Sequence, residues 1–217
     1  MAGPRPGGSV PWIAALLAHE SERRKLGKLN HPQKGGILVH HTGTQLLQSQ
    51  RLLLRPFQLS DVDSCVNNWA TDPATYRYLS QEPRTPQQVY DWLSTAKQAY
   101  ANPETYYWAI VEKSSNQVVG EIFVDDFSSR NRWCELDWKV GQRVQGNGYA
   151  TQAAGLVLDY LRNEVGFHRI QAKCCVENHA SRRVMEKLGM VPEGVLHDFF
   201  LGKDGRWMDV VMYALLG

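Results

Sequence analysis

The residues whose types and spacing most clearly suggest chemistry form the run Gln145-Gly146-Asn147-Gly148-Tyr149-Ala150. A predicted strand leads into this run and a predicted helix leaves it. The first N–H groups of a helix have no partner within the helix, and the helix dipole adds partial positive charge there. Because glycines let an anion approach the backbone closely, the run predicts phosphate or pyrophosphate binding by main-chain groups. An ordinary hairpin with an Asn-Gly turn has the same local pattern and stays open as an alternative.

Other phosphate-binding motifs fit this run less well. No Gly-Lys-Ser/Thr follows it, which excludes the P-loop of nucleotide triphosphatases. Thr151 occupies the place of the third glycine of a dinucleotide fingerprint. That fingerprint also opens a parallel βαβ unit, whereas this run follows a predicted antiparallel meander.

Hydrophobic spacing and turn residues predict the elements that position the run. We expect an α/β (α+β) fold in the order β-α-α-β-β-β-α-β-α-β-β, with a mixed, mostly antiparallel sheet of about seven strands flanked by helices. The predicted strands are 51–57, 107–112, 117–125, 132–140, 169–176, 195–201 and 207–215. Helices are predicted to begin at Ser60, Thr85, Ala150 and Asn178.

Length and composition predict one domain with an appendage. The chain has 217 residues, of which 43% are apolar, and its 24 Lys and Arg against 22 Asp and Glu leave a net charge of +2. This balance argues against a strongly basic nucleic-acid binder, and no apolar run approaches the roughly 20 residues of a membrane span. We therefore expect neither nucleic acid nor a membrane as a partner. The four cysteines form no CxxC pair, which favours reduced thiols in a cytoplasmic protein and no metal.

Residues 1–38 are predicted to form the appendage, and residues 39–217 the main domain. The appendage would hold one short amphipathic helix, with Trp12, Ile13, Leu16 and Leu17 on one face. The apolar stretch 10–18 has some features of a signal peptide, but no small-x-small cleavage site follows it.

Three separated motifs resemble those of one enzyme family. The pattern Gln145-x-x-Gly148-x-Ala150 is similar to the Q/R-x-x-G-x-G/A signature of the GNAT superfamily of N-acetyltransferases. The segment 178–190 resembles the second signature of that superfamily. Segments 51–57 and 205–210, together with Asn68-Trp69 and Asp72-Pro73, resemble the RimJ/RimL branch, whose founding members acetylate the N-termini of ribosomal proteins. The resemblance covers residues 41–217.

The resemblance implies a GNAT-like fold and acetyl-CoA as cosubstrate. The pyrophosphate would lie on the N–H groups of residues 145–150, and the peptide-like pantetheine arm would pair with the strand end 138–140. In the family this strand splays from the next one, and the thioester enters the gap. The cofactor-binding residues implied in this way are Trp138, Lys139, Val140, Gln145, Gly146, Asn147, Gly148, Tyr149, Ala150, Asn178 and Ser181.

Two residues are candidates for the chemistry itself. Ser181 matches the serine that protonates the departing thiolate, since Met185 stands where some relatives have a tyrosine. Glu135 lies on the strand expected to hold the pantetheine and could serve as base. From the residues without the resemblance, Asn178 is a plain helix N-cap, and Glu135 a cross-strand partner of Arg132 or Arg169. Glu121, Asp198 or a water chain stay open as other bases.

The function implied is an acetyl-CoA-dependent N-acetyltransferase. A protein N-terminal α-amine is the leading acceptor, and a small-molecule amine, including an antibiotic, is the alternative. A non-catalytic acyl-CoA-binding module of the same fold is a second alternative. A homodimer is compatible with each of them.

Overall fold

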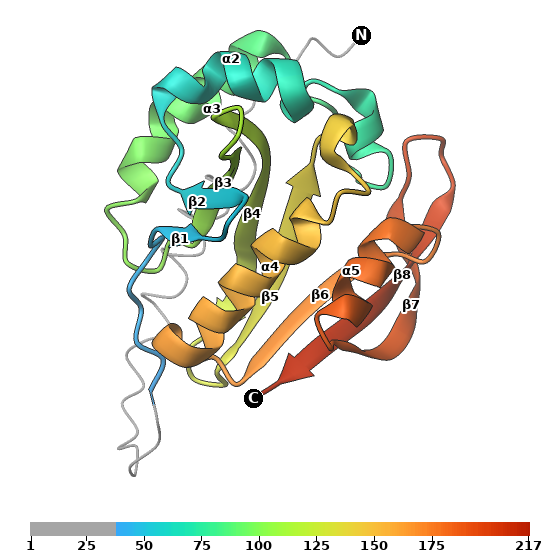
Figure 1. Ribbon diagram of the computed structural model, residues 1–217. Coiled ribbons are helices and arrows are strands. Elements are labelled where there is room, and N and C mark those ends of the chain that lie inside the picture. Colours follow the sequence, from blue (N-terminus) through green and yellow to red (C-terminus); the bar gives the residue numbers. More distant parts are fainter. Residues whose placement is uncertain (1–37) are drawn as a thin grey trace, which may run out of the picture. The chain divides into compact units, whose positions relative to one another are not determined.

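An eight-stranded mixed sheet organises the part of the chain that the computed structural model describes, residues 38–217 (Figure 1). The strand order is β1-β2-β3-β4-β5-β6-β8-β7. Neighbouring strands are antiparallel except for β5 and β6, which are parallel. The strands are β1 (Leu47–Gln48), β2 (Leu52–Arg55), β3 (Tyr107–Glu112), β4 (Gln117–Ser128), β5 (Trp133–Val140), β6 (Arg169–Cys175), β7 (Val191–Leu201) and β8 (Trp207–Leu216).

The observed sheet confirms the predicted fold class. Its additional strand is the two-residue β1, which is too short to leave a periodic pattern in the sequence. The predicted appendage of residues 1–38 and its helix lie outside the described residues, apart from Leu38. Within residues 38–217, no helix combines the length and the apolar character that crossing a membrane requires.

The helices and helical turns follow the predicted order. They are η1 (Leu59–Asp61), α2 (Val62–Cys65), η2 (Val66–Ala70), η3 (Pro73–Tyr76), α3 (Pro86–Ala99), η4 (Gln142–Val144), α4 (Tyr149–Tyr160), η5 (Leu161–Val165) and α5 (His179–Lys187). Thr85 caps α3 in a capping box with Gln88. Ser60 is not a cap, because the first helical turn begins one residue earlier, where the Gln58 N–H donates to the Asp61 carboxylate at 2.8 Å.

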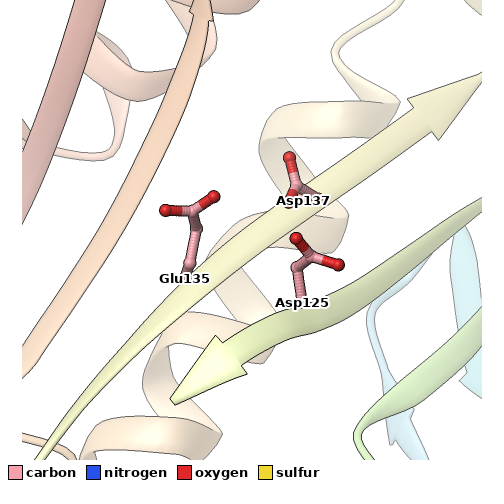
Figure 2. A group of neighbouring side chains, drawn as sticks. All are labelled: Asp125, Glu135 and Asp137. Carbon is pink, nitrogen blue, oxygen red and sulfur yellow. The ribbon is translucent and has the colours of Figure 1, made fainter. Parts of the chain in front are cut away.

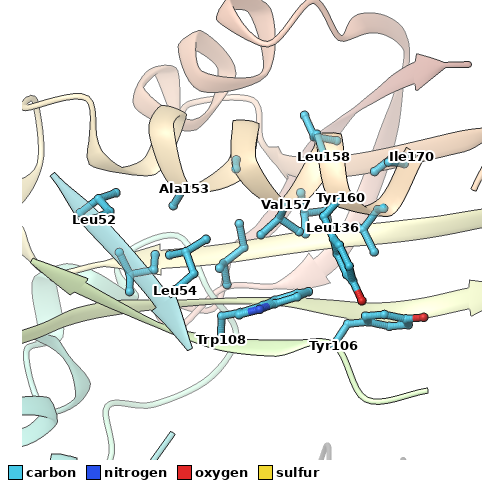
Figure 3. Packing of buried hydrophobic residues seen from close by; sticks show 14 of the residues in the cluster. Leu52, Leu54, Tyr106, Trp108, Leu136, Ala153, Val157, Leu158, Tyr160 and Ile170 are labelled. Atoms are coloured by element: carbon cyan, nitrogen blue, oxygen red, sulfur yellow. The ribbon is translucent and has the colours of Figure 1, made fainter. Parts of the chain in front are cut away.

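Helices cover both faces of the sheet. On one face α4 packs on Trp108 and Leu136, within the main hydrophobic cluster (Figure 3). On the opposite face α3 places the Trp92 ring 5.9 Å from that of Tyr107. Helix α5 packs on β6 through the fully buried Met185. Side chains that alternate along β5 are therefore divided between the α4 face and the face on which α3 lies.

Candidate active site

The sheet opens between β5 and β6. Their parallel pairing covers only three positions and ends at Glu135 opposite Gln171. Beyond this point the segments 136–140 and 172–175 continue without pairing with each other, and the two strands diverge (Figure 1). Trp138 is partly buried in this region and packs against both hydrophobic clusters, the one under α4 and the one under α5. The unpaired end of β5 thus leaves main-chain groups for an extended, peptide-like ligand.

A glycine-rich turn joins the end of β5 to the start of α4. Gly146 and Gly148 have φ angles of +78° and +79°, in the left-handed region that favours glycine. Gly148 is the N-cap of α4 and has no side chain to satisfy the first N–H groups of the helix. A Cβ added at either glycine would meet no protein atom within 4 Å, so the turn faces open space. The run is a strand–turn–helix, and the hairpin alternative is wrong.

Side chains fix this turn and bring positive charge to it. The Gln145 side chain donates to the Val140 carbonyl at 3.1 Å, and Arg51 Nη1 donates to the Asn147 carbonyl at 3.1 Å. The Arg51 guanidinium also lies 4.2 Å from the centre of the Tyr149 ring. Arg143 is exposed in the preceding turn, 3.8 Å from Glu112. The loop therefore carries two cations that the sequence analysis missed, and only Arg143 had a signal, its position just before the glycines.

The N-terminus of α5 contributes Asn178 and Ser181. The Asn178 side chain accepts the Ser181 N–H at 3.1 Å, which confirms its interpretation as an N-cap. Ser181 is partly buried, and its side chain is hydrogen-bonded with the Cys174 thiol on β6. Burial raises the pKa of Cys174 to about 11, against the opposing effect of that hydrogen bond. Ser181 therefore lies over β6, the strand that diverges from β5.

Glu135 is buried and paired, but its partners differ from those predicted. Its carboxylate accepts a hydrogen bond from Gln171 Nε2 at 2.9 Å and forms an ion pair with Lys173. The predicted arginine partners are wrong. Arg169 pairs with Glu193 at 2.5 Å, and Arg132 donates to the Gly166 carbonyl at 2.9 Å. The parallel register explains the difference, because it places Gln171 opposite Glu135 and Lys173 two residues further along the same face.

Two more carboxylates stand beside Glu135. Those of Asp125, Glu135 and Asp137 each offer an oxygen within 4.8 Å of the others, and Figure 2 shows them gathered where β4 and β5 run side by side. Oxygen donors of this kind suit a hard cation, but the Lys173 ammonium already contacts Glu135. Asp137 shares the face of Glu135 because side chains alternate along β5, and the approach of Asp125 depends on a shift of register in β4.

Comparison with known proteins identifies the family. The acetyltransferase (GNAT) domain model matches residues 51–191. The chain belongs to the GNAT family of acetyltransferases. An uncharacterized N-acetyltransferase of Bacillus licheniformis is 28% identical over 173 residues, which cover 79% of this chain and 96% of that protein. The crystal structure of a GNAT-family acetyltransferase from Bacillus anthracis has a TM-score of 0.69 at 27% identity and covers 79% of this chain and 98% of that one.

A relative with a named substrate supports the branch as well. The [Ribosomal protein uS5]-alanine N-acetyltransferase of Escherichia coli (strain K12) is 28% identical over 127 residues, 57% of this chain and 63% of that enzyme. The resemblance inferred from the motifs is thus confirmed. The family uses acetyl-CoA as cosubstrate, and this acetyltransferase carries the glycine turn that the family signature describes.

Glu121 and Asp198, the alternative candidates for the base, lie in different environments. Glu121 is 1% exposed and binds Lys139 Nζ at 2.5 Å and the Tyr107 hydroxyl. Burial acts to raise the pKa of Glu121, but the charges of Lys139 and Arg84 outweigh it and hold that pKa below its usual value. Asp198 is exposed on β7, where its N–H donates to Asp209 at 2.9 Å. In this acetyltransferase Glu121 is therefore a buried ion-pair partner of Lys139, whose side chain lies on the same face of β5 as Glu135 and Asp137.

A cavity of about 370 Å³ lies between the segment after η3 and the β7–β8 hairpin of the acetyltransferase. Tyr78 and Leu79 line one side, Phe200 and Met208 the other, and Glu177 stands just before α5. The Tyr78 carbonyl accepts the Cys175 thiol at 3.4 Å, which joins this wall to the end of β6. Its volume falls within the range of small-ligand pockets.

Proposed function

We propose that this acetyltransferase transfers the acetyl group of acetyl-CoA to the α-amine of a protein N-terminus. The observation that carries the proposal is the cavity beside the end of β6, between the segment after η3 and the β7–β8 hairpin. We place the chain terminus of the acceptor in this cavity, which adjoins Cys175 at the end of β6. The likeness to an enzyme named for the alanine of ribosomal protein uS5 supports a peptide acceptor.

The cosubstrate would be held mainly by main chain. The N–H groups of residues 145–150 would bind the pyrophosphate at the start of α4, and Arg51 and Arg143 would balance its charge. The segment Trp138-Lys139-Val140 would pair with the pantetheine arm along the unpaired end of β5. Asn178 and Ser181 would close the site from the α5 side.

The transfer requires three events from this chain. A base removes a proton from the acceptor ammonium, and the free amine attacks the thioester carbonyl. A main-chain N–H near Val140 would stabilise the oxyanion. Ser181 would donate a proton to the departing thiolate. Glu135, the other catalytic candidate, is held by Lys173 and Gln171, which favours a positioning role for it.

Ser181→Ala is expected to lower kcat by about 100-fold, the lower end of general-acid effects. The backbone N–H that Asn178 accepts is kept in this variant, so α5 retains its cap. Steady-state kinetics with a fixed acceptor measure kcat, and calorimetry checks that the Kd for CoA is unchanged. A variant with the wild-type kcat would remove Ser181 from the chemistry.

A panel of acceptors tests the proposed function directly. Peptides with different N-terminal residues, small primary amines and aminoglycoside antibiotics are each incubated with acetyl-CoA, and CoA release is followed. We expect the highest kcat/KM for a peptide. Faster turnover of a small amine favours the small-molecule alternative, and CoA binding without turnover of any amine favours the non-catalytic module.

Location and assembly complete the proposal. The four cysteines are free and buried, which fits the reducing cytoplasm that we propose as the location.

Strand β7 is an edge strand and exposes Val191, Leu196 and Leu201. An exposed edge of this kind can pair with a second strand, so we assign the proposed homodimer contact to it.

A further inference from the structure

Asp137 lies at the point where β5 leaves β6. The last paired position of the two strands is Glu135 opposite Gln171, and Asp137 follows two residues later. On its other side it is opposite Phe123 of β4. Because Leu136 belongs to the core under α4, the alternation of β5 directs Asp137 to the opposite face, together with Glu135. Its position is one residue before the segment proposed to hold the pantetheine.

The three neighbouring carboxylates differ in what binds them. Glu135 is held by Gln171 and by the Lys173 ammonium. Asp125 is exposed to solvent on β4. The Asp137 carboxylate has no hydrogen bond and no ion pair with any of residues 38–217. Asp125 has no such partner either, so Asp137 is the unpaired member of the trio that is partly buried and lies next to the last paired position of β5 and β6.

Several charges face Asp137 from three strands. Asp125 and Glu121 lie on β4, Glu135 and Lys139 on β5, and Lys173 on β6. Burial first, and then the charges of Asp125 and Glu121, raise the pKa of Asp137 to about 7 against the opposing charge of Lys139. Burial also lowers the pKa of Lys173, against the attraction of Asp125 and Asp126. A carboxylate tuned in this way accepts protons near neutral pH.

We propose that Asp137 is the catalytic base of this acetyltransferase, which takes a proton from the ammonium group of the acceptor. The proposal rests on acetyl transfer to an amine, whichever acceptor is used. The ammonium N–H bond breaks and Asp137 becomes the neutral acid. The freed nitrogen lone pair forms the bond to the thioester carbon and the carbon–sulfur bond breaks. The thiolate takes a proton from Ser181, and the second proton that the nitrogen loses replaces it on the serine hydroxyl. Products are the amide and CoA thiol, and Asp137 returns its proton to solvent.

Lys173 and Glu135 have a supporting role in this arrangement. The Lys173 ammonium offsets the negative charge of Glu135. Glu135 can therefore lie close to Asp137 with less repulsion of its ionised form. Glu135 is a positioning residue in this proposal, whereas the sequence made it the candidate base. The two assignments predict different pH profiles for the corresponding amide variants.

Asp137→Asn is expected to lower kcat by about 10² to 10⁴, the range for loss of a general base, with little change in the Kd for CoA. In the wild type kcat/KM should rise with pH around the pKa of Asp137, about 7, because the base must be ionised. The asparagine variant should lose this rise. Glu135→Gln, the matched control, should keep it, and Asp137→Glu should restore part of the rate.

Asp125→Asn gives a second test that keeps Asp137 in place. Removal of the Asp125 charge should lower the pKa of Asp137, so the rise of kcat/KM should shift to lower pH. This variant tests whether Asp137 is the base even if the Asp137→Asn protein does not fold. An unshifted rise would contradict the proposal. A rise that survives in Asp137→Asn and disappears in Glu135→Gln would overturn it and make Glu135 the base.

The acceptor panel separates this proposal from the proposed function. Any amine that the wild type acetylates serves for the pH profiles. If only small amines react, the peptide acceptor is wrong and the test of Asp137 stands unchanged. If no amine reacts at all, both the proposed function and the role of Asp137 are contradicted.

Discussion

Replacement of Lys139 by methionine is expected to destabilise the protein by about 3 to 5 kcal/mol, the usual cost of breaking a buried ion pair from one side. The Lys139 and Glu121 side chains are 8% and 1% exposed, and their charged atoms lie 2.5 Å apart. Methionine fills similar space but leaves the Glu121 carboxylate without its nearest counterion. Urea unfolding followed by circular dichroism measures the change in free energy.

The double variant Lys139→Met/Glu121→Leu is the matched control. It removes both charges, and buried pairs replaced by apolar residues of similar size are often no less stable than the original pair. We therefore expect it to recover most of the stability lost in the single variant. A Lys139→Met protein as stable as the wild type would show that Arg84 and Tyr107 suffice to hold the Glu121 charge.

The same pair predicts how stability depends on pH. The pKa of Glu121 is held below its usual value of about 4.3 in the folded protein. The contribution of ionised Glu121 to the stability is thus complete above that value and is lost as the pH falls through the lower pKa of the folded state. The difference in free energy of unfolding between the wild type and Lys139→Met should therefore become smaller at acidic pH.

Local signals in the sequence were sufficient to predict several elements of the fold and the glycine turn. Thr85-Pro86 predicted the start of α3, and the strand 107–112 is observed with the predicted bounds. The glycines at 146 and 148 combine positive φ with a helix start, which a Gly-x-Gly run before an apolar helical stripe indicates directly. Each of these signals is contained within a few neighbouring residues.

The parts that the sequence did not predict depend on long-range pairing. Strand β1 is formed by pairing with β2, in which Leu47 lies opposite Leu54. Strand β7 begins at Val191 and not at the predicted position 195, because an edge strand tolerates Pro192. The approach of Asp125 to Asp137 needs the register shift after Val124. No local pattern encodes such a shift, so the unpaired carboxylate at the divergence becomes visible only in the folded chain.

Substitution of valine at Gly146 or Gly148 is expected to weaken CoA binding by well over tenfold, a loss of more than about 1.4 kcal/mol in binding free energy. No protein atom lies within 4 Å of a Cβ added at either position. The new side chain would therefore project into the space in which we place the pyrophosphate. Titration calorimetry with CoA gives the Kd of each variant.

Gly189→Val separates the loss of the anion site from backbone strain. Gly189 follows α5, has a φ of +76°, and is likewise free of protein atoms within 4 Å of an added Cβ. Valine should cost a comparable strain there, about 1 to 2 kcal/mol for a left-handed backbone, and lower the stability without changing the Kd. If all three variants lose stability equally and all three keep the wild-type Kd, the glycine turn is not the phosphate site. If only the two loop variants lose CoA, the main chain of residues 145–150 carries the binding, because strain is then common to all three and the position of the new side chain is the remaining difference.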